Sequence, residues 1–289
     1  MASRAEAEEA LSASQAEDTL QRHQRGHFDD HALLARSAEV LLKGRAAGSS
    51  TTPERVLLAA EQAALSASAA GDSILARRGA DVLTGAFPRS HRTARARGVA
   101  LEAEGKLSDA EQLYDSTLES DPTDPRLLRR RAVLERSRNR PRNAIKRMCD
   151  YLDTYSADVD AWAALGCWYA ELLKHSLAIF CFEEVLLSQP QDTRTHSTLA
   201  ESCYTHGDYT KARHHFAAAV QLSNGNDVRS LFGLVLCGPG GLRENLPQLA
   251  SSRLLSLYQS KSPSHLPLVR PVIASSKTGD RTDSSSASK

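Results

Sequence analysis

Small side chains recur along this sequence every 34 residues, between apolar and polar positions that follow a helical period. Alanine occupies one position of each period, as Ala76, Ala110, Ala144, Ala178 and Ala212. Glycine or alanine occupies a second position, as Ala64, Gly98, Ala132, Gly166 and Ala200. The period predicts five two-helix units in unbroken register, at 57–90, 91–124, 125–158, 159–192 and 193–226. We therefore expect an all-α fold in which each unit covers the apolar face of its neighbour.

The fourth unit shows the pattern most fully, and its characteristic residues are Trp162, Leu165, Gly166, Tyr169, Ala178, Phe182 and Pro190. Their spacing is typical of the tetratricopeptide repeat. Small residues fit where the two helices of a unit cross, larger ones fill the space beside the crossing, and proline ends the second helix. The same positions in other units add Gly98, Ala110, Tyr114, Ala144, Ala212 and Phe216 to the expected packing residues. The sequence thus predicts a tetratricopeptide-repeat solenoid, an α-α superhelix of about five repeats with helical caps.

The two ends of the chain lack the repeat pattern. Residues 30–43, 227–237 and 243–259 read as further helices, and Ser, Pro, Lys and Asp dominate from Lys261 onward. The predicted organisation is an N-terminal extension, partly disordered (1–28), an N-terminal capping helix with a linker (29–56), the five repeats (57–226), C-terminal capping helices (227–260) and a disordered tail (261–289).

The composition of the 289 residues narrows the environment of the protein. The formal net charge is +1, and no stretch approaches the ~18 apolar residues that a membrane span needs. The first 20 residues are acidic and alanine-rich, unlike a signal peptide. Five cysteines occur without a Cys-x-x-Cys pair, which indicates reduced thiols rather than a disulfide framework. We expect a soluble protein of the cytosol whose contact with any membrane is indirect.

Candidate chemistry is sparse. The best group of possible metal ligands is Cys203, His206, His214 and His215, but its spacing is not that of a zinc site. We interpret Cys203 as a small buried residue of the repeat core and the histidines as surface residues. No nucleophile, phosphate-binding or metalloprotease motif is present either. The sequence predicts no catalytic, cofactor-binding or metal-binding residue and a protein that is not an enzyme.

The strongest charge feature is the stretch 126–147, with ten basic residues and one acidic residue, Glu135. The unit before it is rich in Asp and Glu. Three interpretations are open: a surface paired within the chain, a docking surface for an acidic partner protein, and a nucleic-acid or lipid surface. Stacking aromatic residues of the kind that bind single-stranded RNA are scarce near this stretch, so we expect no nucleic-acid partner.

Some of these charges are predicted to line a groove. In this repeat, positions 2, 5, 9 and 12 of the first helix usually face the concave side. The residues at such positions that we expect to bind a partner are Arg92, Arg95, Arg126, Arg129, Arg136, Arg194, Glu201 and Tyr204. The groove should be basic toward its N-terminal half and should receive an acidic segment or a helix C-terminus. Val99 stands where chaperone-binding repeats carry an Asn, which argues against their carboxylate clamp.

Three segments go beyond what the general repeat demands: FPRSHR (87–92), AEQLYDSTLESDPTD (110–124) and AIFCFEEVLLSQP (178–190). With their neighbours they resemble subunit 2 of the endoplasmic reticulum membrane protein complex, a family of cytosolic tetratricopeptide-repeat proteins. The resemblance implies a peripheral scaffold on the cytoplasmic side of that membrane. Such a scaffold holds membrane-embedded and soluble subunits together and supports insertion of tail anchors and first transmembrane spans. The alternative is a soluble tetratricopeptide-repeat adaptor for chaperones or another cytosolic assembly.

Overall fold

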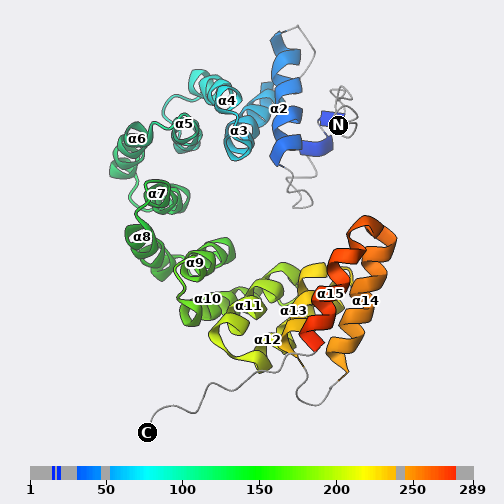
Figure 1. Ribbon diagram of the computed structural model, residues 1–289. Helices are drawn as coiled ribbons and strands as arrows, with labels where there is room; N and C mark the ends of the chain where they lie inside the picture. The colour runs from blue at the N-terminus through cyan, green and yellow to red at the C-terminus, as the bar shows by residue number, and fades with distance from the viewer. Residues whose placement is uncertain (1–14, 17, 21–30, 47–52, 239–244, 278–289) are drawn as a thin grey trace. The chain divides into compact units, whose positions relative to one another are not determined.

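The computed structural model describes residues 15–16, 18–20, 31–46, 53–238 and 245–277. Every regular element in these ranges is helical, so the predicted all-α fold is confirmed. The helices are α2 (His31–Ala46), α3 (Pro53–Ala70), α4 (Ser73–Ala86), α5 (His91–Ala103), α6 (Leu107–Ser120), α7 (Pro125–Ser137), α8 (Pro141–Thr154), α9 (Val159–Glu171), α10 (His175–Ser188), α11 (Thr193–His206), α12 (Tyr209–Leu222), α13 (Val228–Cys237), α14 (Leu246–Lys261) and α15 (Leu266–Lys277), with a 3₁₀ turn η1 (Pro263–His265) (Figure 1).

Ten of these helices form the five pairs that the period predicts, from α3 and α4 to α11 and α12. Aspartate begins several of them at the repeat distance: Asp124, Asp158 and Asp192 precede α7, α9 and α11. Each of these side chains accepts a hydrogen bond from a backbone N–H of the first turn, which satisfies a donor that the helix itself leaves unpaired. The sequence therefore sets the start of each repeat locally.

The two helices of a unit can approach closely because one position of the first helix carries a small residue. A Cβ atom added to Gly98 would lie 2.1 Å from Cε1 of Tyr114, and one added to Gly166 would lie 2.8 Å from Cε1 of Phe182. The alanines of the second helices are buried as well. Trp162 differs from the other large residues, because it is half-buried, donates its indole N–H to the carbonyl of Ser156 at 2.9 Å and meets the exposed Phe180 edge-on.

The chain divides into two compact units, residues 1–151 and 152–289. The first contains an alanine-rich core under α2–α5, and Ala16 and Leu20, from the helical residues 15–16 and 18–20, are buried beside α2. The core of the second holds Phe182, Phe216 and Leu254 among its members. Their helices can be followed by label and colour in Figure 1.

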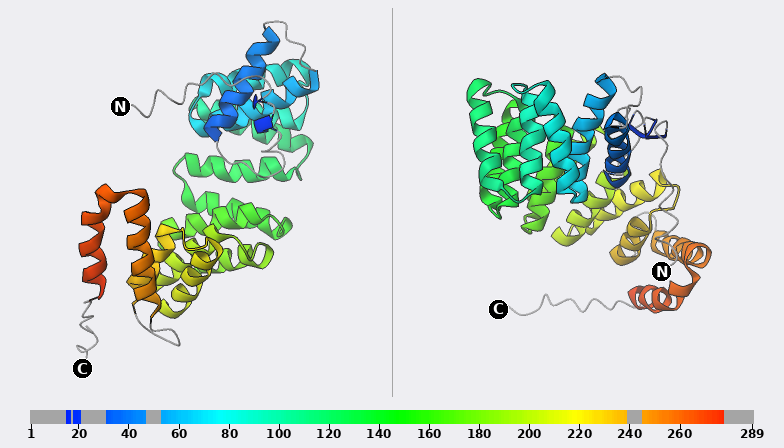
Figure 2. Two further views of the ribbon diagram at one scale, coloured as in Figure 1. Left: turned by 90° about the vertical axis from the view of Figure 1, so that its right-hand side faces the viewer. Right: turned by 90° about the horizontal axis from the view of Figure 1, so that it is seen from above.

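The prediction of a disordered tail from residue 261 onward is wrong for its helical part. Residues 266–277 form α15, whose Ile273 is buried and whose Val269 packs against the core of the second unit. Figure 2 shows α14 and α15 side by side. Apolar residues three and four positions apart give this segment one buried face, and that burial outweighs the presence of Pro271 within the helix. Residues 278–289 and most of 1–28 lie outside the described residues, as does the linker segment 47–52.

Within the described ranges, no helix is both long and apolar enough to cross a membrane. All five cysteines lie in these ranges, and none forms a disulfide.

Candidate partner-binding surfaces

Four arginines predicted to line the groove gather on the first unit, within the first five residues of α5 and of α7. We call Arg92, Arg95, Arg126 and Arg129 the basic cluster. Arg95 is at its centre: burial lowers the pKa of its guanidinium, Glu61 acts in the opposite direction, and the positive charges of the other three lower it further. Such mutual repulsion requires the four charges to lie close together. The structure therefore assembles a positive surface from residues of two successive repeats.

One carboxylate lies within the basic cluster. Glu61 of α3 is almost fully buried and accepts hydrogen bonds from both Arg92 and Arg95, the latter at 3.2 Å. Sequence reasoning missed Glu61, although it precedes Arg95 by one 34-residue period and therefore occupies the same groove position in the first repeat. Glu61 therefore offsets part of the positive charge of Arg92 and Arg95.

The rest of the basic stretch is largely paired within the chain. Arg130 binds Glu102 through two hydrogen bonds of 2.9 and 3.0 Å, and Glu102 also accepts the hydroxyl of Tyr114 at 2.7 Å. Arg138 donates to Glu111 and, at 3.0 Å, to the carbonyl of Leu107. For these arginines, intramolecular pairing is the interpretation that the contacts support.

Arg131 forms the largest of these ion-pair groups. Its side chain is 6% exposed and donates to Asp115 at 2.7 and 3.0 Å, to Glu111 at 2.5 Å and to Glu135 at 3.2 Å. Burial acts to lower the pKa of Arg131, but Asp115 and Glu111 more than offset this and raise it. The group joins α6 to α7, so opposite charges of neighbouring repeats hold these repeats together.

Arg136, also predicted for the groove, is half-buried near the end of α7.

The second unit carries a different surface. A cavity of about 610 Å³ opens beside α11 and α13, and we call it the aromatic pocket. Its lining consists of Glu201, Tyr204, Thr205, Phe216, Val228, Arg229, Phe232, Gly233, Leu236 and Tyr258. An ion pair between Arg229 and Glu201 lies at the pocket, and both partners reach solvent. The pocket is therefore apolar in most of its lining and locally neutral in charge.

Two predicted groove residues, Glu201 and Tyr204, line this pocket, whereas Arg194 does not. Arg194 is exposed at the start of α11, where its backbone N–H donates to Asp192 at 3.2 Å. Sequence reasoning missed Phe232 and Tyr258, because they belong to α13 and α14, beyond the last full repeat. The apolar run of α13 was the signal that could have indicated them.

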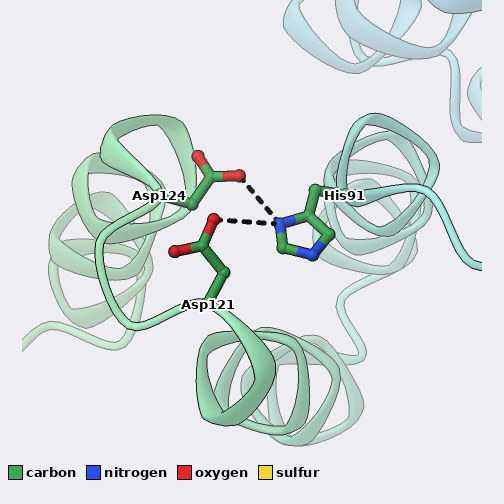
Figure 3. A group of neighbouring side chains, drawn as sticks. All are labelled: His91, Asp121 and Asp124. Carbon is green, nitrogen blue, oxygen red and sulfur yellow. Dashed lines mark hydrogen bonds and ion pairs between the residues drawn. The ribbon is translucent and has the colours of Figure 1, made fainter.

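The cysteine and histidine residues weighed as metal ligands lie in different surroundings. Cys203 is fully buried, and burial raises the pKa of its thiol to about 11. His206 and His214 are exposed, whereas His215 is half-buried with its Nδ1 3.2 Å from Nδ1 of His196. A different group brings three possible ligand atoms together: His91, Asp121 and Asp124 (Figure 3).

The helix pairs and their packing define a tetratricopeptide-repeat protein. This chain is similar to a solved structure from Pseudomonas aeruginosa entitled "Functional Characterization of Pseudomonas Aeruginosa pilF". The likeness covers 76% of this chain and 98% of the solved chain, with a TM-score of 0.53 and 18% sequence identity. At that identity the likeness concerns the fold alone.

Residues 84–215 match the family model described as "EMC2 TPR-like repeat domain". "ER membrane protein complex subunit 2" of Xenopus tropicalis is 35% identical over 153 residues, which cover 52% of this chain and 51% of the relative. "TPR repeat protein oca3" of Schizosaccharomyces pombe is 34% identical over 131 residues, 45% of this chain and 46% of the relative. The chain thus spans about half the length of these curated relatives. The resemblance inferred from the sequence is confirmed over this part of the chain.

Proposed function

We propose that this chain is a non-catalytic scaffold subunit of an endoplasmic reticulum membrane protein complex. In this proposal it lies peripherally on the cytoplasmic side and holds membrane-embedded and soluble subunits together, which supports insertion of transmembrane segments. The observation that carries the proposal is the match of residues 84–215 to the repeat domain of that complex's second subunit. The matched range contains the whole basic cluster and the part of the aromatic pocket formed by α11.

The two surfaces suit different parts of protein partners. Guanidinium groups form short, charge-assisted hydrogen bonds with carboxylates, so the basic cluster suits an acidic segment or the C-terminal end of a partner helix. The aromatic pocket suits a large apolar side chain, because buried aromatic contacts supply much of the energy of protein interfaces. A scaffold with two such surfaces can bind two partner segments at once.

Co-purification tests the assignment as a whole. Tagged full-length protein is recovered from membranes in mild detergent, and the associated chains are identified by mass spectrometry. We expect a fixed, stoichiometric set of multispanning proteins of the endoplasmic reticulum. Recovery of soluble chaperones alone, or of RNA-binding proteins alone, would contradict the proposal and leave the repeat fold unaffected.

Charge reversal tests the basic cluster. The double variant Arg126→Glu/Arg129→Glu should reduce recovery of at least one membrane subunit, because it replaces attraction with repulsion. The matched control is Arg142→Glu/Lys146→Glu, which reverses two exposed charges on α8. Equal recovery with both double variants, each with a normal helical circular dichroism spectrum, would show that the cluster binds no partner of the complex.

A further inference from the structure

Three side chains from separate helix ends converge on the first unit (Figure 3). His91 is the first residue of α5, Asp121 follows the last residue of α6, and Asp124 precedes α7. Nδ1 of His91 lies 3.2 Å from Oδ2 of Asp124 and 3.7 Å from Oδ2 of Asp121. All three ligand atoms lie within 4.8 Å of one another. One nitrogen therefore faces two carboxylate oxygens.

Both carboxylates are held in place by their other oxygen. Oδ1 of Asp124 accepts the backbone N–H groups of Arg126 at 2.9 Å and Leu127 at 3.3 Å. Oδ1 of Asp121 accepts the hydroxyl of Thr123 at 2.9 Å and its N–H at 3.1 Å. Outer partners that orient the ligands in this way are typical of metal sites.

Helix capping explains only one of the three residues. An aspartate equivalent to Asp124 recurs one and two periods later and begins a helix each time, so helix capping explains it. The residues one and two periods after His91 are Pro125 and Val159, and those after Asp121 are Tyr155 and Gln189. Neither His91 nor Asp121 is demanded by the repeat. Among these junctions, the combination of all three occurs only between the second and third repeats.

We propose that His91, Asp121 and Asp124 form a binding site for a divalent cation of the zinc class. Zinc binds imidazole nitrogen and carboxylate oxygen at about 2.0–2.2 Å, and tetrahedral geometry then separates two ligand atoms by about 3.3–3.5 Å. The observed separations of 3.2 and 3.7 Å bracket this value. One imidazole nitrogen can donate at most one hydrogen bond, so it cannot fully satisfy two carboxylates, whereas a divalent cation bound by all three groups neutralises both charges.

The ligand side chains can be reached from solvent. The side chains of His91 and Asp121 are 34% and 44% exposed. A cation bound there would tie the start of α5 to the turn between α6 and α7, and thereby fix the second repeat against the third.

Calorimetric titration with zinc chloride tests the site. Full-length protein is first freed of metal with a chelator, and the binding stoichiometry and affinity are compared with those of His91→Ala and Asp121→Asn. We expect each variant to lose one bound ion per chain or to bind it at least ~10-fold more weakly. The matched control is Asp158→Asn, which alters the equivalent cap of α9, where Pro125 and Tyr155 replace the two other ligands. This control should bind zinc as the unaltered chain does.

A second measurement separates this site from adventitious binding. Cobalt in a tetrahedral site containing nitrogen and oxygen ligands absorbs visible light, and this absorption should appear with the unaltered chain and vanish with both variants. Asp121→Asn decides the question if His91→Ala does not fold, because the amide oxygen can still accept the bonds from Thr123. The proposal is overturned if the unaltered chain binds no zinc, or if Asp121→Asn binds it with unchanged affinity and stoichiometry.

Discussion

The two compact units use one repeat pattern but hold their helices together differently. In the first unit, the contact between α6 and α7 depends on Arg131 and the carboxylates around it. In the second, the contact between α12 and the following helix α13 depends on an aromatic ring, because Phe216 lies on Gly233. Within a repeat both units place a ring on a glycine, Tyr114 on Gly98 and Phe182 on Gly166. The pattern fixes where the helices begin and cross, but it leaves the chemistry of the contact between them open.

This difference has a physical reason. Compared with the cluster that holds Phe182 and Phe216 in the second unit, the buried apolar cluster where α6 meets α7 in the first unit is small and consists of Ala110, Tyr114, Leu127 and Leu134. Ion pairs then contribute to its cohesion, but a buried ion pair is sensitive to the loss of either partner, because the remaining charge stays away from water. Aromatic contacts lose only area and packing when they are altered. The two units should therefore respond differently to substitution and to acid.

The largest effect is expected for Arg131→Met. Removal of the guanidinium leaves Glu135, 4% exposed, with only the longer ion pairs to Arg140 and Arg147, at 3.8 and 3.5 Å. We expect the free energy of unfolding to fall by about 3–5 kcal/mol, the range for breaking a buried ion pair. Chemical denaturation, with amide hydrogen exchange over α6 and α7, measures it. Arg126→Met, at an exposed position, is the control. If Arg131→Met lowers the free energy of unfolding by less than ~1 kcal/mol, the ion-pair group does not stabilise the contact between α6 and α7 as we expect.

Gly98→Ala should destabilise the same unit by about 1–3 kcal/mol, because the added methyl overlaps the buried ring of Tyr114. Tyr114 cannot move away freely while its hydroxyl donates to Glu102. Gly85→Ala in α4 is the matched control, since a Cβ atom there meets nothing within 4 Å. It should raise stability by about 0.5–1 kcal/mol through helix propensity. Thermal unfolding midpoints that move in the same direction for both variants would contradict this account.

Acid should weaken the second unit at higher pH than the first. Burial, aided by the neighbouring charges of His196 and His214, lowers the pKa of His215 from 6.5 to about 4. The unfolded chain therefore takes up this proton first. The stability that neutral His215 contributes is present above pH 6.5 and is lost as the pH falls toward about 4. Both tryptophans, Trp162 and Trp168, lie in the second unit, so their fluorescence in urea reports the loss.

The first unit depends instead on carboxylates such as Glu111. Burial acts to raise its pKa, but hydrogen bonds from Arg138 and Arg131 outweigh burial and lower it below the ordinary 4.5. Its contribution is thus present above pH 4.5 and is lost only below it. His215→Gln should flatten the fluorescence-detected loss between pH 6.5 and 4 and leave exchange protection in α6 unchanged. An unaltered pH profile in this variant would exclude His215 as the cause.

The smallest effect is expected for Arg229→Met. The side chains of Arg229 and Glu201, which form an ion pair, are 66% and 34% exposed. Exposed ion pairs contribute about 0–1 kcal/mol to the free energy of unfolding. A urea denaturation midpoint close to that of the unaltered chain would sharpen the contrast with Arg131→Met. A loss comparable to that of Arg131→Met would mean that exposure does not distinguish the two ion pairs.

The sequence predicted the helix pairs closely, because their signals are local. Asp158 begins α9 through bonds to its own first turn, and the spacing between Gly98 and Tyr114 fixes a contact within one hairpin. It failed for α15, where proline and serine suggested disorder. The burial of Ile273 against the second unit stabilises that helix, and this contact with residues distant in sequence outweighs the local effect of the proline.

The candidate surfaces were predicted only in part for a related reason. Repeat positions indicated the four arginines of the basic cluster, since residues one period apart face the same side. The repeat positions did not indicate that Glu61 forms ion pairs with two of these arginines or that Arg130 pairs with Glu102. They also did not indicate that Tyr258 lines the aromatic pocket.

The sequence by itself determined the period, the helix ends and the small residues at the crossings, because each depends on neighbours within about one repeat. Only the tertiary structure decided which charges neutralise one another and which side chains, such as His91 and Asp121, converge. Convergence depends on side-chain rotamers and on the packing of helices from different repeats, and these are set only when the repeats stack.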